Sequence, residues 1–103
     1  MIQINGTIRL APGTIANAGD TLEAIKTMVA ASRAEDGCFD YTFAQDLSDP
    51  DVLIVYERWR DRDALAAHGS SPHMAAFRKV LAANPPVGSN LRIYETDEGQ
   101  PLG

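Results

Sequence analysis

Residues 38–59, CFDYTFAQDLSDPDVLIVYERW, decide the fold. Residues 38–46 and 52–59 are rich in aromatic and β-branched side chains, which favour strands. Between them lies Ser48-Asp49-Pro50-Asp51, whose residue types favour a turn. Two strands joined by so short a connection predict an antiparallel hairpin.

Alternation along this hairpin predicts which side chains share a face. In the first strand, Phe39, Tyr41 and Phe43 fall on one face. The second strand is apolar on both faces, with Leu53, Val55 and Trp59 on one and Val52, Ile54 and Tyr56 on the other. A strand that is apolar on both faces is covered on both sides. One helical layer covers only one face, so we expect a second copy of the chain to cover the other and form a homodimer.

The flanking sequence adds two strands and the helices. Residues 2–10 alternate between apolar and polar side chains, and residues 88–97 read as the last strand. Asp61 is the predicted N-cap of a short helix over residues 62–68, and Ser71 that of a longer helix ending at Asn84. A further helix, ended by Gly37, is predicted by apolar residues at spacings of three and four: Ile15, Ala18, Leu22, Ile25 and Val29.

The resulting order is strand, helix, strand, strand, helix, strand. This order predicts an α+β fold of the ferredoxin-like βαββαβ type, with an antiparallel sheet and helices on one face. The length of 103 residues predicts a single domain over residues 1–103, in which residues 98–103 form a flexible tail.

Composition excludes several classes of function. The net charge of −5 argues against a nucleic-acid partner, because phosphate binding needs concentrated positive charge. No apolar run approaches the ~20 residues that span a bilayer. We see no signal-peptide pattern in the first residues and expect a cytoplasmic protein without a membrane partner. The single cysteine, Cys38, excludes an intrachain disulfide.

Four short motifs resemble the antibiotic biosynthesis monooxygenase (ABM) domain family, and the resemblance spans residues 2–96. The motifs are EDGCFDY at 35–41, YERW at 56–59, ALAAH at 64–68 and SPHM at 71–74. The resemblance implies a protomer that dimerises sheet to sheet into a dimeric α+β barrel. It also implies a quinol-monooxygenase-like enzyme, which oxidises a small aromatic or quinol-type molecule with O2 and no cofactor. Two alternatives stay open: a non-catalytic dimeric module that binds a small metabolite, and a degradative enzyme or isomerase acting on a small signalling molecule.

The haem-degrading branch of the family fits poorly. That branch uses an Asn, Trp and His triad, and the corresponding positions here fall at or near Ile8, His68 and Arg78. The resemblance therefore does not extend to haem degradation.

His68 is the candidate catalytic base, because an unperturbed imidazole titrates near neutrality and can accept a phenol proton. In the structural alternative, His68 is only a helix-end residue that packs on Trp59. In the same alternative, the aromatic side chains named next belong to the ordinary hydrophobic core. The expected substrate-binding residues are Trp59, Tyr41, Phe43, Phe77, His73 and Tyr56.

Neither a cofactor nor a metal is expected. The chain has no glycine-rich phosphate loop and no dinucleotide fingerprint. Its two histidines have no carboxylate at a fixed ligand spacing, which makes a poor metal site. Glu57, flanked by apolar residues, is expected to form a structural polar link, with Arg92 or a backbone donor as its partner.

Overall fold

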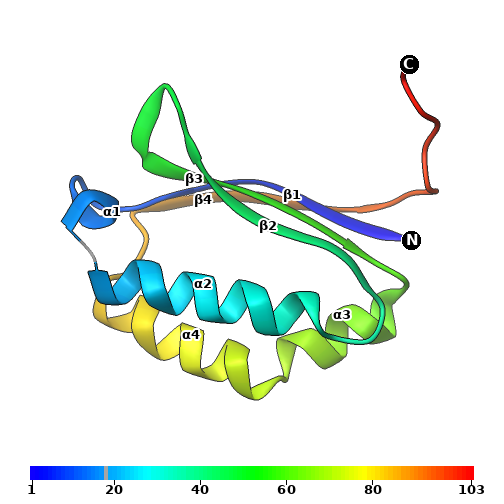
Figure 1. The fold of residues 1–103 in the computed structure, drawn as a ribbon, viewed down its shortest axis with the longest axis horizontal. Coiled ribbons are helices and arrows are strands. Elements are labelled where there is room, and N and C mark those ends of the chain that lie inside the picture. Colours follow the sequence, from blue (N-terminus) through cyan, green and yellow to red (C-terminus); the bar gives the residue numbers. More distant parts are fainter. Residues whose placement is uncertain (18) are drawn as a thin grey trace.

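The computed structural model describes residues 1–17 and 19–103. The helices α2, α3 and α4 lie on one side of the sheet and leave its other side open (Figure 1). The elements in chain order are β1 (Ile2–Arg9), α1 (Thr14–Asn17), α2 (Gly19–Arg33), β2 (Cys38–Asp46), β3 (Asp49–Trp59), α3 (Arg62–Gly69), α4 (Pro72–Ala83) and β4 (Gly88–Glu95).

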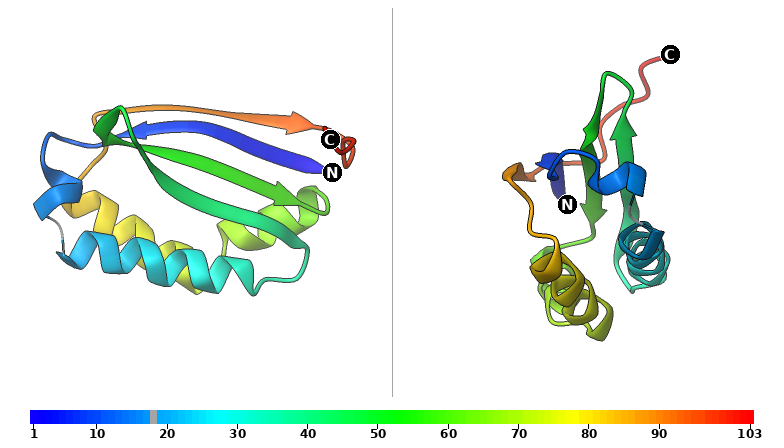
Figure 2. Two further views of the ribbon diagram at one scale, coloured as in Figure 1. Left: turned by 45° about the horizontal axis from the view of Figure 1, so that its top comes forward. Right: turned by 90° about the vertical axis from the view of Figure 1, so that its left-hand side faces the viewer.

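The strands form one antiparallel sheet in the order β2-β3-β1-β4 (Figure 2). This is the ferredoxin-like arrangement, so the predicted α+β fold class is confirmed. In β1, Gly6 allows the close approach of β4: it has a φ of 142°, and a Cβ there would lie 1.9 Å from the Asn90 carbonyl oxygen. After β4, residues 96–103 adopt neither helix nor strand, and the flexibility of residues 98–103 stays a prediction.

The predicted single helix before the hairpin is wrong in one respect, because the structure forms two helices there, α1 and α2. Ala18, which the spacing placed in the apolar stripe, lies outside the described residues. Gly37 adopts the predicted positive φ, at 80°. It follows the end of α2 by four residues and therefore shapes the turn into β2 rather than the last helical turn.

β2 has the predicted bounds, but the predicted face of Phe39 is wrong. Phe39 is 49% exposed, whereas Tyr41 is 2% exposed. The pairing of β2 with β3 shifts register between Cys38 and Asp40. Such a bulge adds one residue to a strand and breaks its alternation. Cys38, rather than Phe39, therefore packs against the same core as Tyr41.

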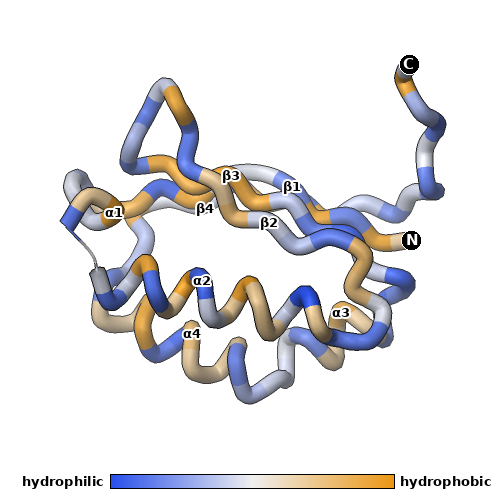
Figure 3. Tube along the Cα trace, in the orientation of Figure 1, coloured by the Kyte–Doolittle hydropathy of each residue, from blue (hydrophilic) through white to orange (hydrophobic). Residues whose placement is uncertain are grey.

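The core lies between the helices and the sheet. Apolar residues recur along both layers of the chain (Figure 3). Leu53, Val55 and Trp59 are buried in the core, as the alternation of β3 predicts. Ile54 and Tyr94, on the open face of the sheet, are exposed in the single chain. Within the described residues, none of the helices has the length and apolar character needed to cross a membrane.

The predicted N-caps begin α3 and α4. The Asp61 carboxylate accepts a hydrogen bond from the backbone N–H three residues later, at 2.8 Å, and the Ser71 hydroxyl does the same at 3.3 Å. The Ser71 hydroxyl also donates to the His68 carbonyl, at 2.7 Å. These caps fix the junction of the two helices, which places His68 in the last turn of α3 and His73 in the first turn of α4.

Candidate functional site

His68 is held by hydrogen bonds on both ring nitrogens. Its side chain is buried, and the residue is only 4% exposed. Nδ1 lies 2.7 Å from Oε2 of Glu35, which follows α2. Nε2 lies 3.3 Å from the hydroxyl of Tyr41, which reaches in from β2. Helix α3, strand β2 and the turn after α2 thus fix one imidazole between a carboxylate and a phenol.

This arrangement determines where the proton sits on a neutral His68. An ionised carboxylate can only accept, so Nδ1 donates to Glu35, and Nε2 is the free base that accepts from Tyr41. Burial lowers the pKa of His68 and outweighs the opposing effect of Glu35. Burial also raises the pKa of Tyr41, which keeps the phenol protonated. A neutral imidazole with Nε2 unprotonated has the form required of a general base.

Aromatic rings enclose the imidazole. The Trp59 ring centroid lies 4.6 Å from that of His68, and the Tyr41 centroid 5.1 Å. Trp59 is fully buried, and its indole N–H donates to Oε1 of Glu57 at 2.9 Å. Glu57 therefore forms the expected polar link, but with an indole partner rather than with Arg92 or a backbone donor. Burial raises the pKa of Glu57.

His73 lies on the other side of the same carboxylate. Its Nε2 atom is 3.4 Å from Oε1 of Glu35, and its ring centroid is 6.0 Å from that of His68. Among the described residues, Nε2 of His73 is a buried nitrogen without a hydrogen-bond partner. Glu35, His68 and His73 thus form one cluster, whose potential ligand atoms all lie within 4.8 Å of one another.

The role of Glu35 was missed by the sequence analysis, although Glu35 belongs to the first family motif. It lies 33 residues before His68 and outside any helix or strand, so no periodicity connects the two. The available signal was the acidic pair before Gly37, at the end of a helix that packs beside α4.

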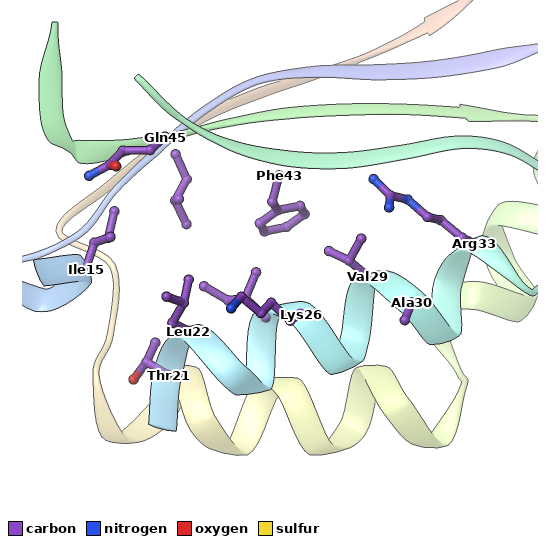
Figure 4. Close-up of a pocket in the computed structure, with 11 residues that line it drawn as sticks. Ile15, Thr21, Leu22, Lys26, Val29, Ala30, Arg33, Phe43 and Gln45 are labelled. Carbon is purple, nitrogen blue, oxygen red and sulfur yellow. The ribbon is translucent and has the colours of Figure 1, made fainter. Parts of the chain in front are cut away.

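A pocket of about 450 Å³ opens between α2 and the edge of the sheet at β2 (Figure 4). Phe43 points into it from the sheet, while Lys26 and Arg33 contribute cationic groups from α2. The candidate base His68 and the expected substrate-binding residue Trp59 do not belong to the lining of this pocket. The physical reason is that the rings of Tyr41, Trp59 and His68 pack on one another and fill the space around the imidazole.

The other expected substrate-binding residues fall into two groups. Phe43 stacks on Tyr41, with centroids 5.8 Å apart, and meets the buried Phe77 edge to face at 6.1 Å. Phe43 therefore continues the aromatic cluster from His68 through Tyr41 to the pocket, whereas Phe77 packs behind it and does not line the pocket. Tyr56 does not join them, because it points to the open face of the sheet, opposite to Trp59 on the same strand.

The sequence matches known proteins over most of its length. The model of the antibiotic biosynthesis monooxygenase family matches residues 1–80. "Uncharacterized protein sll1783" of Synechocystis is 32% identical over 80 residues, which are 75% of this chain and 52% of that protein. "Putative monooxygenase Rv0793" of Mycobacterium tuberculosis is 39% identical over 54 residues, 52% of each chain. The matched segments thus span about half the length of these relatives.

Solved structures share the fold. A protein from Deinococcus radiodurans, described as a "putative antibiotic biosynthesis monooxygenase", superposes with a TM-score of 0.84 at 23% identity, covering 100% of this chain and 99% of its own. The protein PA3566 of Pseudomonas aeruginosa superposes with a TM-score of 0.79 at 28% identity, covering 92% of each chain. The ferredoxin-like architecture is therefore common to this chain and these proteins.

Proposed function

Because the chain belongs to the antibiotic biosynthesis monooxygenase family, we propose that it is a cofactor-independent monooxygenase acting on a small aromatic, quinol-type substrate with O2. The observation that carries this proposal is the hydrogen-bonded chain from Glu35 through His68 to Tyr41. It leaves an unprotonated Nε2, oriented by a carboxylate, in an aromatic environment. Such a base suits a reaction that begins with removal of a proton from an electron-rich ring.

The proposed reaction draws all its electrons from the substrate. Nε2 of His68 removes a proton from a phenol hydroxyl of the substrate, and the resulting anion passes one electron to O2. The substrate radical and superoxide combine into a peroxide, which takes back the proton from His68. Loss of water then leaves one oxygen atom on a ring carbon that had carried hydrogen, so that a hydroquinone and O2 become a hydroxyquinone and H2O.

Glu35 serves as a positioning residue in this scheme. Its hydrogen bond to Nδ1 fixes the tautomer and stabilises the imidazolium that forms when Nε2 takes up the proton. The pocket beside Phe43 provides an apolar site of suitable size for a small aromatic ring. Tyr41 packs against both Phe43 and His68. Because its hydroxyl lies 3.3 Å from Nε2 of His68, a substrate must displace that hydroxyl to reach Nε2.

A homodimer is part of the same proposal. The open face of the sheet exposes Ile54 and Tyr94, and a second copy packed there would bury them and close a dimeric α+β barrel. A stable pair should bury well over ~1,000 Å². Light scattering at micromolar concentration should give twice the mass of the chain, and a monomer would contradict this part. The cytoplasmic location also stays a proposal, to be tested by cell fractionation.

The test of the activity is O2 consumption by the purified protein with a panel of hydroquinones and anthrones and no added cofactor. His68→Gln should lower kcat by ~10²-fold or more, the scale of general-base catalysis. Glu35→Gln should lower kcat with little change in KM, because it orients the base without contacting the substrate. Lys79→Ala, at an exposed position on α4, is the matched control and should keep full activity. Full activity in His68→Gln would refute the role of this base.

A second candidate, a non-catalytic binding module, is favoured by one observation. The pocket is open and largely apolar, yet His68 does not line it. If the panel compounds bind stoichiometrically without O2 uptake or product, the binding module becomes the better description.

A further inference from the structure

We infer that Glu35, His68 and His73 form a binding site for one divalent transition-metal ion of the zinc type. The three residues come from the turn after α2, the end of α3 and the start of α4, and the fold brings them together. The inference does not depend on the proposed oxygenase activity. The sequence predicted no metal site for want of a nearby carboxylate, and in the folded chain Glu35 supplies one.

The spacing of the donor atoms is compatible with a shared ion. Zinc binds imidazole nitrogen and carboxylate oxygen at about 2.0–2.2 Å, so two ligand atoms on a tetrahedral ion lie about 3.3 Å apart. Nε2 of His73 and Oε1 of Glu35 are 3.4 Å apart. Nδ1 of His68 and Oε2 of Glu35 are closer, at 2.7 Å, because a proton joins them. Replacing that proton by an ion requires only a small separation of the two side chains.

The ring nitrogen of His73 provides an independent observation at the cluster. Its Nε2 atom is buried and faces the carboxylate without making a hydrogen bond to any described residue. An unsatisfied buried nitrogen costs free energy, and a metal ion would remove that cost. The two oxygens of Glu35 face different histidines, Oε2 facing His68 and Oε1 facing His73. The carboxylate can therefore bind an ion that lies between the two imidazoles.

The surroundings supply the remaining requirements of a metal site. A metal-bound histidine donates its other N–H to a fixed acceptor, and the Tyr41 hydroxyl lies in that position at Nε2 of His68. A surface pocket of about 260 Å³ reaches Glu35 and is also lined by Asp36, Asp63 and Arg60, so the carboxylate of the cluster is accessible from solvent. Three protein ligands leave a coordination position for water or a small ligand.

The donor set selects the class of ion. Two imidazoles and one carboxylate suit Zn²⁺ and its neighbours in the first transition row, whereas Mg²⁺ and Ca²⁺ prefer oxygen ligands. Because His68 and His73 are the only histidines in the sequence, specific binding at imidazole reports on this cluster alone.

The test is calorimetric titration of the metal-free full chain with zinc chloride, with magnesium chloride as a comparison. We expect one Zn²⁺ per chain and no measurable heat from Mg²⁺. His73→Gln is the decisive variant, because His73 is partly exposed and its change should leave the fold intact, as far-UV circular dichroism will show. Loss of a ligand should weaken binding more than ~100-fold, and Tyr41→Phe, which removes only an outer partner, by ~10–100-fold.

Cys38→Ser is the matched control, since a thiol is the main competing ligand in this region. The variant should bind zinc like the parent chain. Cobalt(II) offers a second readout, because nitrogen and oxygen ligands give visible bands without the intense near-ultraviolet absorption of a thiolate complex. Unchanged zinc binding in His73→Gln, loss of binding in Cys38→Ser, or no binding by the parent chain would each overturn the inference.

Discussion

Trp59→Phe tests the energetic role of the hydrogen bond between the indole and Glu57. Both residues are buried: Trp59 is 0% exposed and Glu57 is 7% exposed. Phenylalanine keeps a ring at this position but has no N–H. The carboxylate that accepted at 2.9 Å would then lose a buried donor.

The expected cost has two parts. Leaving a buried acceptor without its donor costs about 1–3 kcal/mol. The smaller ring also leaves a cavity of roughly 40 Å³, which adds about 1 kcal/mol at ~24 cal/mol per Å³. We therefore expect Trp59→Phe to lower the free energy of unfolding by about 2–4 kcal/mol.

Urea unfolding at pH 7, followed by far-UV circular dichroism, measures this loss. Fluorescence is unsuitable because Trp59 is the only tryptophan. All variants are compared at one protein concentration, since dimerisation would make stability depend on it. Repeating the substitution in a Glu57→Gln background should reduce its cost by about 1 kcal/mol, because a neutral amide loses less than a buried charge. An equal cost in both backgrounds would refute the importance of the hydrogen bond.

Three further predictions concern single positions. Burial raises the pKa of Cys38 from 9.0 to about 11, which lowers the fraction of reactive thiolate at pH 8. Alkylation of Cys38 by iodoacetamide at pH 8 should therefore be about 100-fold slower than that of a free thiol, and an equal rate would contradict this. Gly6→Ala should destabilise the chain strongly, because its Cβ would collide with the Asn90 carbonyl; chemical shifts confined to residue 6 and its chain neighbours would argue otherwise. Burial in the folded state raises the pKa of Glu57 above its ordinary value of 4.5, so the stability of the parent chain should fall as the pH rises above about 4.5. Glu57→Gln removes this loss, so its melting temperature should exceed that of the parent chain at pH 7 and equal it at pH 4.

Local patterns predicted most of the fold. The β2–β3 hairpin, the two N-caps and the order of elements along the chain follow from side-chain period and capping residues, which act over a few positions. The predicted turn at residues 48–51 is misplaced, because β3 already begins at Asp49. Phe39 shows the limit of this reasoning: the bulge next to Cys38 is a property of strand pairing, which the alternation of one strand does not reveal.

The candidate site was predicted less completely, because its parts meet only in three dimensions. His68 was identified by its chemistry, and its contact with Trp59 follows from the fold. Its two hydrogen-bond partners, Glu35 and Tyr41, lie 33 and 27 residues away along the chain. Which carboxylate the His68 side chain faces depends on how α2, β2 and α3 pack together. The spacing of residues in one sequence does not reveal this packing.

The two proposals make opposite demands on His68. As a base, it must keep its proton on Nδ1 against Glu35 and its lone pair on Nε2. As a metal ligand, it must give the Nδ1 lone pair to the ion and place its proton on Nε2, where the Tyr41 hydroxyl becomes the acceptor. One neutral imidazole cannot do both, because it has one proton and one free lone pair. Bound zinc should therefore abolish O2 consumption in proportion to site occupancy, and a chelator should restore it. If the zinc-loaded chain oxidised its substrate at the full rate, Nε2 of His68 could not be the base, while the metal site would stand.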